Sequence, residues 1–130
     1  MSDTTPYEQL GAGRVAAIVD RFYDLMDEDP AYAGLRAMHA ADLAPMRVSL
    51  AGFLTAWLGG PRDWFSERPG ACVMSLHGAM SIGTAVGEQW IEAMERAIAG
   101  DPTIHPDLAA ALSRALGRMA RAMARMPQAA

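Results

Sequence analysis

His77 is the residue of this sequence best suited to do chemistry. It lies in the segment 75–83, where an apolar stretch leads into a Gly/Ser turn and then into a helical run that carries Trp90. A histidine in that setting can present one ring nitrogen to a buried cofactor, as histidines commonly do to haem iron. Because the chain has only three histidines, a single axial ligand is the simplest metal-binding interpretation. Phe22 and Tyr23, together with Trp90, strengthen it.

Each of these residues also has a purely structural interpretation. A lone histidine is more often a hydrogen-bonded structural or surface residue than a metal ligand. Tyr23 could be a tyrosine at the edge of the core whose hydroxyl donates to a neighbouring carbonyl, and the bulk of Trp90 would be buried in either case. His39 has a surface or helix-end alternative, and His105 is expected in a loop. Both interpretations therefore stay open on the residues alone.

The composition describes one acidic domain. A chain of 130 residues of which 52% are hydrophobic is long enough for one core with room for one medium-sized ligand, so we expect a single domain over 1–130. The net charge of −4 and a pI near 5.2 argue against a partner bound through its phosphates. We therefore expect no nucleic-acid partner.

The cysteine content and the N-terminal residues predict a cytoplasmic protein. Cys72 is the one cysteine, so it has no internal disulfide partner, as is usual in a reducing compartment. The first residues lack a signal-peptide pattern, and no apolar run reaches the ~18 residues of a membrane span. The sequence also shows no nucleophile, paired-carboxylate or phosphate-loop arrangement that would support an enzyme without a cofactor.

Apolar residues recur at three- and four-residue spacings, which predicts an all-α fold. We expect helices over 7–10, from Val15 to near Asp29-Pro30, from Asp42 to Gly59, over 72–77, over 84–99 and over 106–126. Segment 31–41 should be a compact connector, and 62–70 a surface loop in which Trp64 and Phe65 tuck against the protein. On the helix that follows Asp42, the residues expected to face inward are Met46, Leu50, Phe53, Leu54 and Trp57.

Several landmarks occur in the order that one known family has them. They are Tyr7-Glu8-Gln9-Leu10-Gly11, Asp20-Arg21-Phe22-Tyr23, Met38-His39-Ala40-Ala41-Asp42-Leu43, the run from Phe53-Leu54 to Trp57-Leu58-Gly59-Gly60-Pro61, then His77 and Trp90. Over residues 7–99 the chain resembles a truncated haemoglobin, most closely the second group of that family. The resemblance implies a truncated globin fold, a helical sandwich around a haem pocket, with haem b as the cofactor.

The resemblance also implies roles for individual residues. His77 would bind the iron, and Tyr23 and Trp90 would donate hydrogen bonds to a bound gas. The other residues that it places around the haem are Phe22, His39, Met46, Leu50, Phe53 and Leu54. Since bound oxygen carries partial negative charge, a phenol or indole donor should stabilise it by ~1 to 3 kcal/mol, and carbon monoxide by far less.

Two departures from the family pattern concern the haem propionates. Met74-Ser75-Leu76 stands just before His77, where the family usually has basic residues, and Ser49 stands where a basic partner is common. Arg47, Arg62 and Arg68 are candidates to replace them.

Three kinds of function are compatible with these observations. The first is a haem-binding globin that reversibly binds oxygen, or nitric oxide, carbon monoxide or sulfide. The second is a haem-free helical module of globin type that binds another ligand or a protein, which the altered segment before His77 favours. The third is a nitric oxide dioxygenase or peroxidase, which would need an unidentified reductase. Enzyme status is therefore left open.

Overall fold

A computed structural model describes residues 5–67 and 83–124, and all regular structure within those ranges is helical. The elements are α1 (Pro6–Leu10), α2 (Ala12–Glu28), the 3-10 helix η1 (Pro30–Tyr32), α3 (Ala33–Ala37), α4 (Ala44–Trp57), α5 (Asp63–Glu67), α7 (Thr84–Ala99) and α8 (Pro106–Ala124). The all-α prediction is confirmed. His77 and the helix predicted over 72–77 lie outside the described residues.

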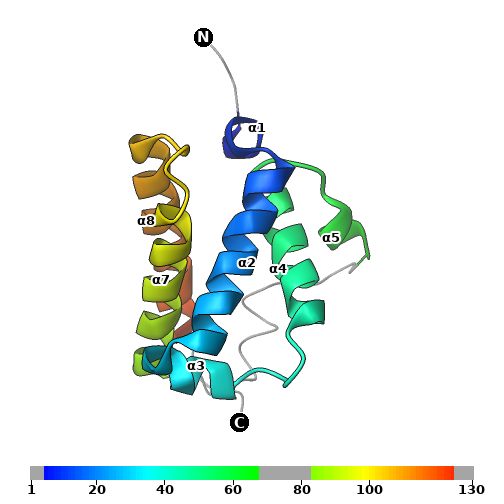
Figure 1. The fold of residues 1–130 in the computed structure, drawn as a ribbon. Coiled ribbons are helices and arrows are strands. Elements are labelled where there is room, and N and C mark those ends of the chain that lie inside the picture. Colours follow the sequence, from blue (N-terminus) through cyan, green and yellow to red (C-terminus); the bar gives the residue numbers. More distant parts are fainter. Residues whose placement is uncertain (1–4, 68–82, 125–130) are drawn as a thin grey trace.

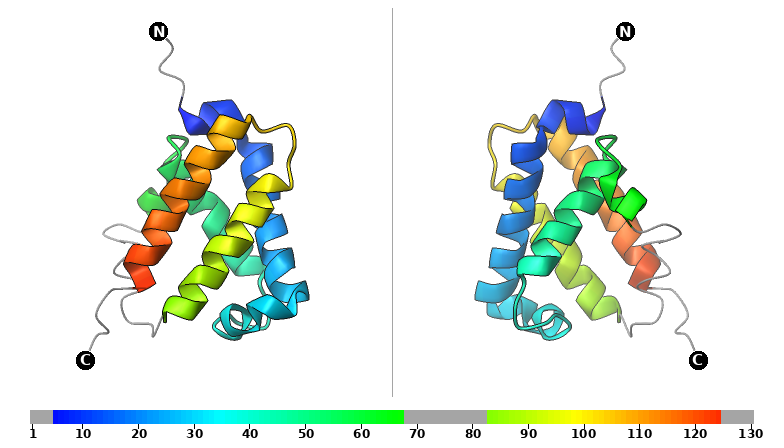
Figure 2. Two further views of the ribbon diagram at one scale, coloured as in Figure 1. Left: turned by 90° about the vertical axis from the view of Figure 1, so that its left-hand side faces the viewer. Right: turned by 90° about the vertical axis from the view of Figure 1, so that its right-hand side faces the viewer.

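The four long helices form two layers (Figure 1). Helices α7 and α8 lie side by side in one layer, and α2 and α4 form the other, as the two views of Figure 2 show. Helix α2 contacts both α4 and α7, so it joins the layers. This is a sandwich of two helices on two. Within the described part of the chain, no helix is long and apolar enough to cross a membrane.

Helix α2 owes its central place to one apolar stripe. Its inward residues are at most 4% exposed: Val15, Ile18, Val19, Phe22, Tyr23 and Met26. The helix ends where predicted, because Asp29 adopts an extended backbone ahead of Pro30. The Asp29 side chain then accepts a hydrogen bond from the N–H of Ala31 at 2.9 Å, which starts η1. The compact connector predicted for 31–41 is thus built largely from η1 and α3.

The chain before α2 packs against the turn after α4. The Tyr7 N–H donates to the carbonyl of Leu58 at 3.0 Å. Gly59 has a φ of +99°, a region that side chains disfavour. A Cβ on Gly60 would lie 2.7 Å from the Tyr7 ring, so only glycine lets the two segments approach this closely. Two landmarks far apart in the sequence, around Tyr7 and Gly59-Gly60, are therefore one packing unit.

The side chains of α4 are buried to different degrees, and part of the core predicted there is wrong. Phe53 and Leu54 are buried, at 7% and 3% exposure, and Leu50 is half-buried. Met46 and Trp57 are each 38% exposed, so the prediction that they face inward is wrong. The helix is apolar on several sides, whereas the described elements packed against it are chiefly α2 and α5. Burial therefore depends on where those neighbours lie, which the periodicity does not specify.

The stretch predicted as a surface loop contains α5, so that prediction is wrong for Asp63–Glu67. Trp64 is only 6% exposed and packs edge-on against Phe53, with ring centres 5.4 Å apart. Its indole N–H donates to the Ser49 hydroxyl at 3.2 Å. The expectation that Trp64 tucks against the protein is confirmed. A five-residue helix is too short to show an apolar repeat, which explains the wrong prediction.

Helix α8, which lies beside α7, has one apolar and one charged face. Leu112 and Leu116 are 5% and 4% exposed, whereas Arg114 and Arg118 face solvent. His105 precedes the helix, and its Nδ1 accepts the N–H of Asp107 at 3.1 Å. His105 therefore caps α8, in the connecting segment where it was expected.

Candidate functional site

Four of the predicted site residues form one row of ring contacts. The Phe22 ring lies 4.9 Å from that of Tyr23 and 5.3 Å from that of Trp90, both in edge-to-face geometry. The Tyr23 ring in turn lies 6.0 Å from His39. The row runs from the segment after α3, across α2, to α7. The fold thus brings together side chains that are far apart in the sequence.

Tyr23 is the buried polar centre of this row. The residue is 2% exposed, and burial raises the pKa of its phenol from 10.0 to about 12, an effect that the nearby charge of Arg47 partly offsets. The phenol therefore keeps its proton throughout the physiological range. A protonated phenol in an apolar setting is a hydrogen-bond donor suited to a small ligand with negative charge on its acceptor atom.

His39 has a defined tautomer when its ring is neutral. Its Nδ1 lies 2.9 Å from the carbonyl oxygen of Leu35. Because a carbonyl only accepts, Nδ1 must carry the proton, which leaves the lone pair on Nε2. His39 thus ends the row with its ring held by the backbone of α3.

Helix α7 is fixed against α3 beside Trp90. The Gln89 side-chain oxygen accepts the backbone N–H of Leu35 at 2.9 Å. Gly34 lies against the same side chain, since a Cβ there would be in ordinary contact with the Gln89 amide at 3.4 Å. Leu35 therefore bonds to Gln89, the residue before Trp90, through its N–H and to His39 through its carbonyl.

The predicted residues of α4 are distributed over several surroundings. Met46, at 38% exposure, and half-buried Leu50 are the partly open apolar residues. Phe53 contacts Trp64 of α5. Leu54 instead lines a small cavity at the other end of α2. The structure therefore does not gather all four side chains beside Tyr23.

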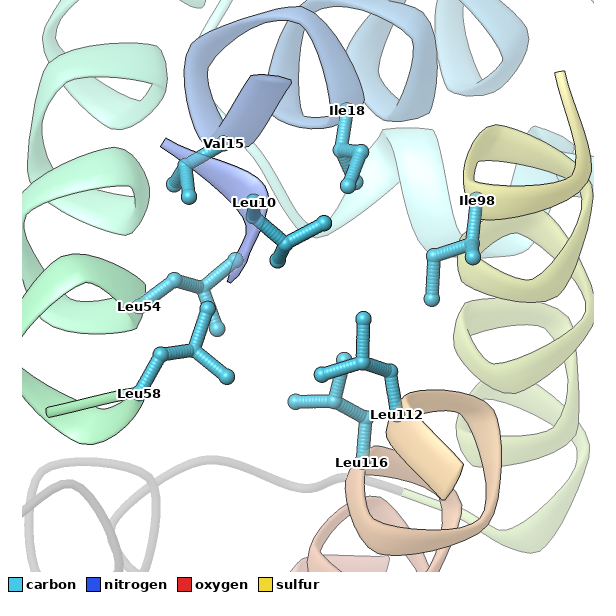
Figure 3. Close-up of a pocket in the computed structure, with 8 residues that line it drawn as sticks. All are labelled: Leu10, Val15, Ile18, Leu54, Leu58, Ile98, Leu112 and Leu116. Carbon is cyan, nitrogen blue, oxygen red and sulfur yellow. The ribbon is translucent and has the colours of Figure 1, made fainter. Parts of the chain in front are cut away.

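That cavity is wholly aliphatic (Figure 3). Its lining residues are Leu10, Val15, Ile18, Leu54, Leu58, Ile98, Leu112 and Leu116. Its volume of about 10 Å³ is roughly that of one water molecule. With no polar group to hold a ligand, it is a packing gap.

Metal ligation by several side chains has no support in residues 5–67 and 83–124. Nowhere in those ranges do three His, Cys, Asp or Glu side chains gather closely enough to hold a metal ion. His77 itself lies outside them, so its role as a ligand stays a prediction. Arg68, a candidate partner for a propionate, lies outside them as well.

Sequence reasoning missed the connections of Arg47 and Ser49. Arg47 bonds to Asp20 and Asp24 of α2, and Ser49 accepts the indole N–H of Trp64. The one available signal for Arg47 is the spacing of two aspartates four residues apart, which places both on one side of α2. The sequence does not show which arginine lies opposite them.

Comparison with known proteins decides the family. The model of the bacterial-like globin family matches residues 5–125. The chain belongs to that family. A solved truncated haemoglobin of Pseudoalteromonas haloplanktis TAC125 is 30% identical, with a TM-score of 0.89 over 94% of this chain and 98% of that one. A group II haemoglobin of Agrobacterium tumefaciens is 33% identical, with a TM-score of 0.86 over 94% and 95%.

A curated relative agrees with the group. The group 2 truncated haemoglobin YjbI of Bacillus subtilis is 27% identical over 97 residues, which is 75% of this chain and 71% of that protein. This globin is therefore a group II truncated haemoglobin with the two-on-two helical fold. The predicted family and fold are confirmed.

Haemoglobin relatives imply haem as the cofactor. The described residues of this globin fit one face of such a group. Met46 and Leu50 offer apolar surface that is partly open, next to Arg47, which lies over the Tyr23 ring. Tyr23 and Trp90 add two hydrogen-bond donors, one on each side of the apolar Phe22 ring. This chemistry suits a flat apolar cofactor with a small polar ligand on it.

Proposed function

We propose that this globin binds haem b through His77 and reversibly binds oxygen, with Tyr23 and Trp90 donating hydrogen bonds to the gas. The observation that carries the proposal is the buried phenol of Tyr23 in the ring row that ends at Trp90. A phenol within a cluster of rings offers one strong hydrogen-bond donor to a small polar ligand. A polar diatomic ligand would accept that hydrogen bond.

Haem would supply the iron to which oxygen binds reversibly. Tyr23 holds its proton because its pKa lies near 12, so its hydroxyl can donate to the gas. Each donor should stabilise oxygen by ~1 to 3 kcal/mol. Carbon monoxide carries less negative charge on its outer atom and gains less. The same donors would also serve nitric oxide or another small polar gas.

We assign the remaining pocket residues by their places in the fold. Phe22 separates Tyr23 from Trp90, and His39 closes the row beside Tyr23. Met46 and Leu50 would form the apolar wall on α4 that excludes water. Phe53 and Leu54 would support α4 from behind, against α5 and against the aliphatic core.

We extend the proposal to the whole chain. One globin domain over 1–130 accords with a family model that spans 5–125. A cytoplasmic site of action accords with the single cysteine, Cys72.

The test is a hemin titration of the purified protein and of His77→Ala, followed by reduction under carbon monoxide. A sharp Soret band that shifts on reduction and on gas binding, and that is lost or altered in His77→Ala, is expected. His105→Asn is the matched control, since it replaces the capping residue of α8 with another good cap and should keep the band.

A different result would redirect the search. If both proteins show only the weak, broad absorption of free hemin, the haem proposal is wrong and a haem-free helical module becomes the working interpretation. If His77→Ala behaves as the parent does, another residue binds the iron.

A further inference from the structure

Arg47 joins the start of α4 to the side of α2 that carries Tyr23. Its Nη2 donates to the carboxylate of Asp24 at 2.9 Å, and its Nη1 donates to the carboxylate of Asp20 at 3.3 Å. The same Nη1 also lies 3.1 Å from the backbone carbonyl oxygen of Asp20. One side chain in the first turn of α4 thus makes three contacts with α2.

These contacts flank Tyr23. Asp20 lies three residues before it and Asp24 one residue after it, so Arg47 spans the stretch of α2 from which the phenol projects. The guanidinium carbon lies 5.8 Å from the centre of the Tyr23 ring. At that distance, a cation stabilises the ring face and its field reaches the phenol. The ring therefore has Arg47 as well as Phe22 and His39 as neighbours.

The charges of these residues stabilise the clamp, by which we mean the bridge that Arg47 makes to Asp20 and Asp24. Two aspartates four residues apart on one helix repel each other, and a cation between them removes that cost. The hydrogen bond to Asp24, above all, raises the pKa of Arg47, a side chain that is charged throughout the physiological range in any case. That positive charge also lowers the pKa of Tyr23, against the larger effect of burial, which makes the phenol a better donor.

The clamp is nevertheless open to ions. The Arg47 side chain is 27% exposed, and those of Asp20 and Asp24 are 62% and 55% exposed. Dissolved salt screens exposed ion pairs of this kind, with a Debye length of about 3 Å at 1 M. The strength of the Arg47 clamp should therefore depend on ionic strength, whereas the packing of the Phe22 ring should not.

We propose that Arg47 is a positioning residue for Tyr23: by bridging Asp20 and Asp24 it holds α4 against α2 and orients the phenol that donates to bound oxygen. This inference rests on the proposed function. It predicts that oxygen release depends on a residue that acts through Tyr23 and does not itself donate to the gas, and that salt modulates that dependence.

The experiment compares Arg47→Gln, Arg47→Lys, Tyr23→Phe and the double variant Arg47→Gln/Tyr23→Phe in the haem-loaded protein. Oxygen release should be about two- to fivefold faster in Arg47→Gln, the size expected for loss of an exposed ion-pair network. Arg47→Lys should lie between the two, since it keeps the charge but not the two-armed geometry. In the Tyr23→Phe background, Arg47→Gln should have no further effect.

Two further measurements separate positioning from general stability. The C–O stretching frequency of the carbon monoxide complex should shift in Arg47→Gln, and 1 M salt should shift the parent in the same direction. In the haem-free protein, the NMR shifts of the Tyr23 ring should change in Arg47→Gln. Arg14→Gln is the control, because Arg14 makes a similar ion pair with Asp101 near the other end of α2.

The outcomes distinguish the inference from the function. If Tyr23→Phe speeds oxygen release but Arg47→Gln leaves the release rate, the C–O frequency and the ring shifts unchanged, Arg47 does not position Tyr23 and the proposed function stands. If Arg47→Gln is equally effective without the phenol, the positioning role is likewise refuted. If Tyr23→Phe itself has no effect, the distal donor is wrong, and this inference fails with it.

Discussion

The two ends of α2 differ in kind. Around Val15 and Ile18 the neighbours are aliphatic and leave only the small gap of Figure 3. Around Phe22 and Tyr23 they are aromatic rings, a histidine and an ion-pair cluster. One helix therefore supplies the packed core at one end and the residues proposed to line the gas pocket at the other.

This difference predicts that stability and ligand binding depend on opposite ends of a single helix. Aliphatic burial is non-directional and tolerates little loss of volume, so that end should dominate the free energy of unfolding. A buried phenol and a row of edge-to-face rings are specific but costly to desolvate. Substitutions at the two ends should therefore change different measured quantities.

The largest effect is expected at the aliphatic end. Leu112→Ala should lower the free energy of unfolding by about 2–5 kcal/mol, because it enlarges a gap that is already lined by side chains of α1, α2 and α4. Urea unfolding measures it. Arg114→Ala, on the exposed face of the same helix, should stay within about 0.5 kcal/mol. Equal losses in both variants would contradict the assignment of the core to this end.

The pH dependence should locate the buried phenol. A tyrosine whose pKa is higher in the folded state contributes stability that is fully present below its unfolded pKa of 10.0 and is lost as the pH rises toward 12. A shift of two pH units corresponds to about 2–3 kcal/mol. The free energy of unfolding, measured from pH 10 to pH 12, should fall by this amount.

Tyr23→Phe should remove most of that alkaline loss. The pKa of Tyr32 is also raised, chiefly by burial. Tyr32→Phe should therefore remove a further part of the stability that is lost at alkaline pH. An unchanged alkaline profile in Tyr23→Phe would mean that its phenol is solvated in the folded state.

The two buried tyrosines give a matched test of oxygen binding. Tyr23→Phe should speed oxygen release by roughly 5- to 150-fold, from the loss of ~1 to 3 kcal/mol of hydrogen bonding. Tyr32 is equally buried, but its hydroxyl donates to Glu92 at 3.0 Å. Tyr32→Phe should therefore leave the release rate, measured by stopped flow, unchanged. A similar acceleration in both would point to a loss of packing.

The last prediction concerns the glycine turn at the aliphatic end. Gly60→Ala should cost about 1–3 kcal/mol, because its Cβ would lie 2.7 Å from the Tyr7 ring and force that ring aside. Gly13→Ala in α2 meets nothing within 4 Å and should stabilise the helix slightly. Thermal unfolding of the two variants measures the contrast. A neutral Gly60→Ala would show that the segment at Tyr7 does not need this close approach.

The sequence by itself determined the helical class, the family and the stripe of α2, because apolar periodicity and ordered landmarks are local properties of the chain. Through the resemblance it placed Phe22, Tyr23, His39 and Trp90 among the pocket residues, and the fold brings the rings of these four together. The roles of these residues, and of His77 beyond the described ranges, stay predictions.

Only the tertiary structure decided which apolar side chains are covered and which charged ones meet. Met46 and Trp57 share the apolar character of Phe53, yet burial depends on where α2 and α5 pack. Trp64 is buried in a helix too short to show a repeat. Arg47 pairs with aspartates more than twenty residues away. Such contacts are set by the relative placement of whole helices, which a one-dimensional pattern does not encode.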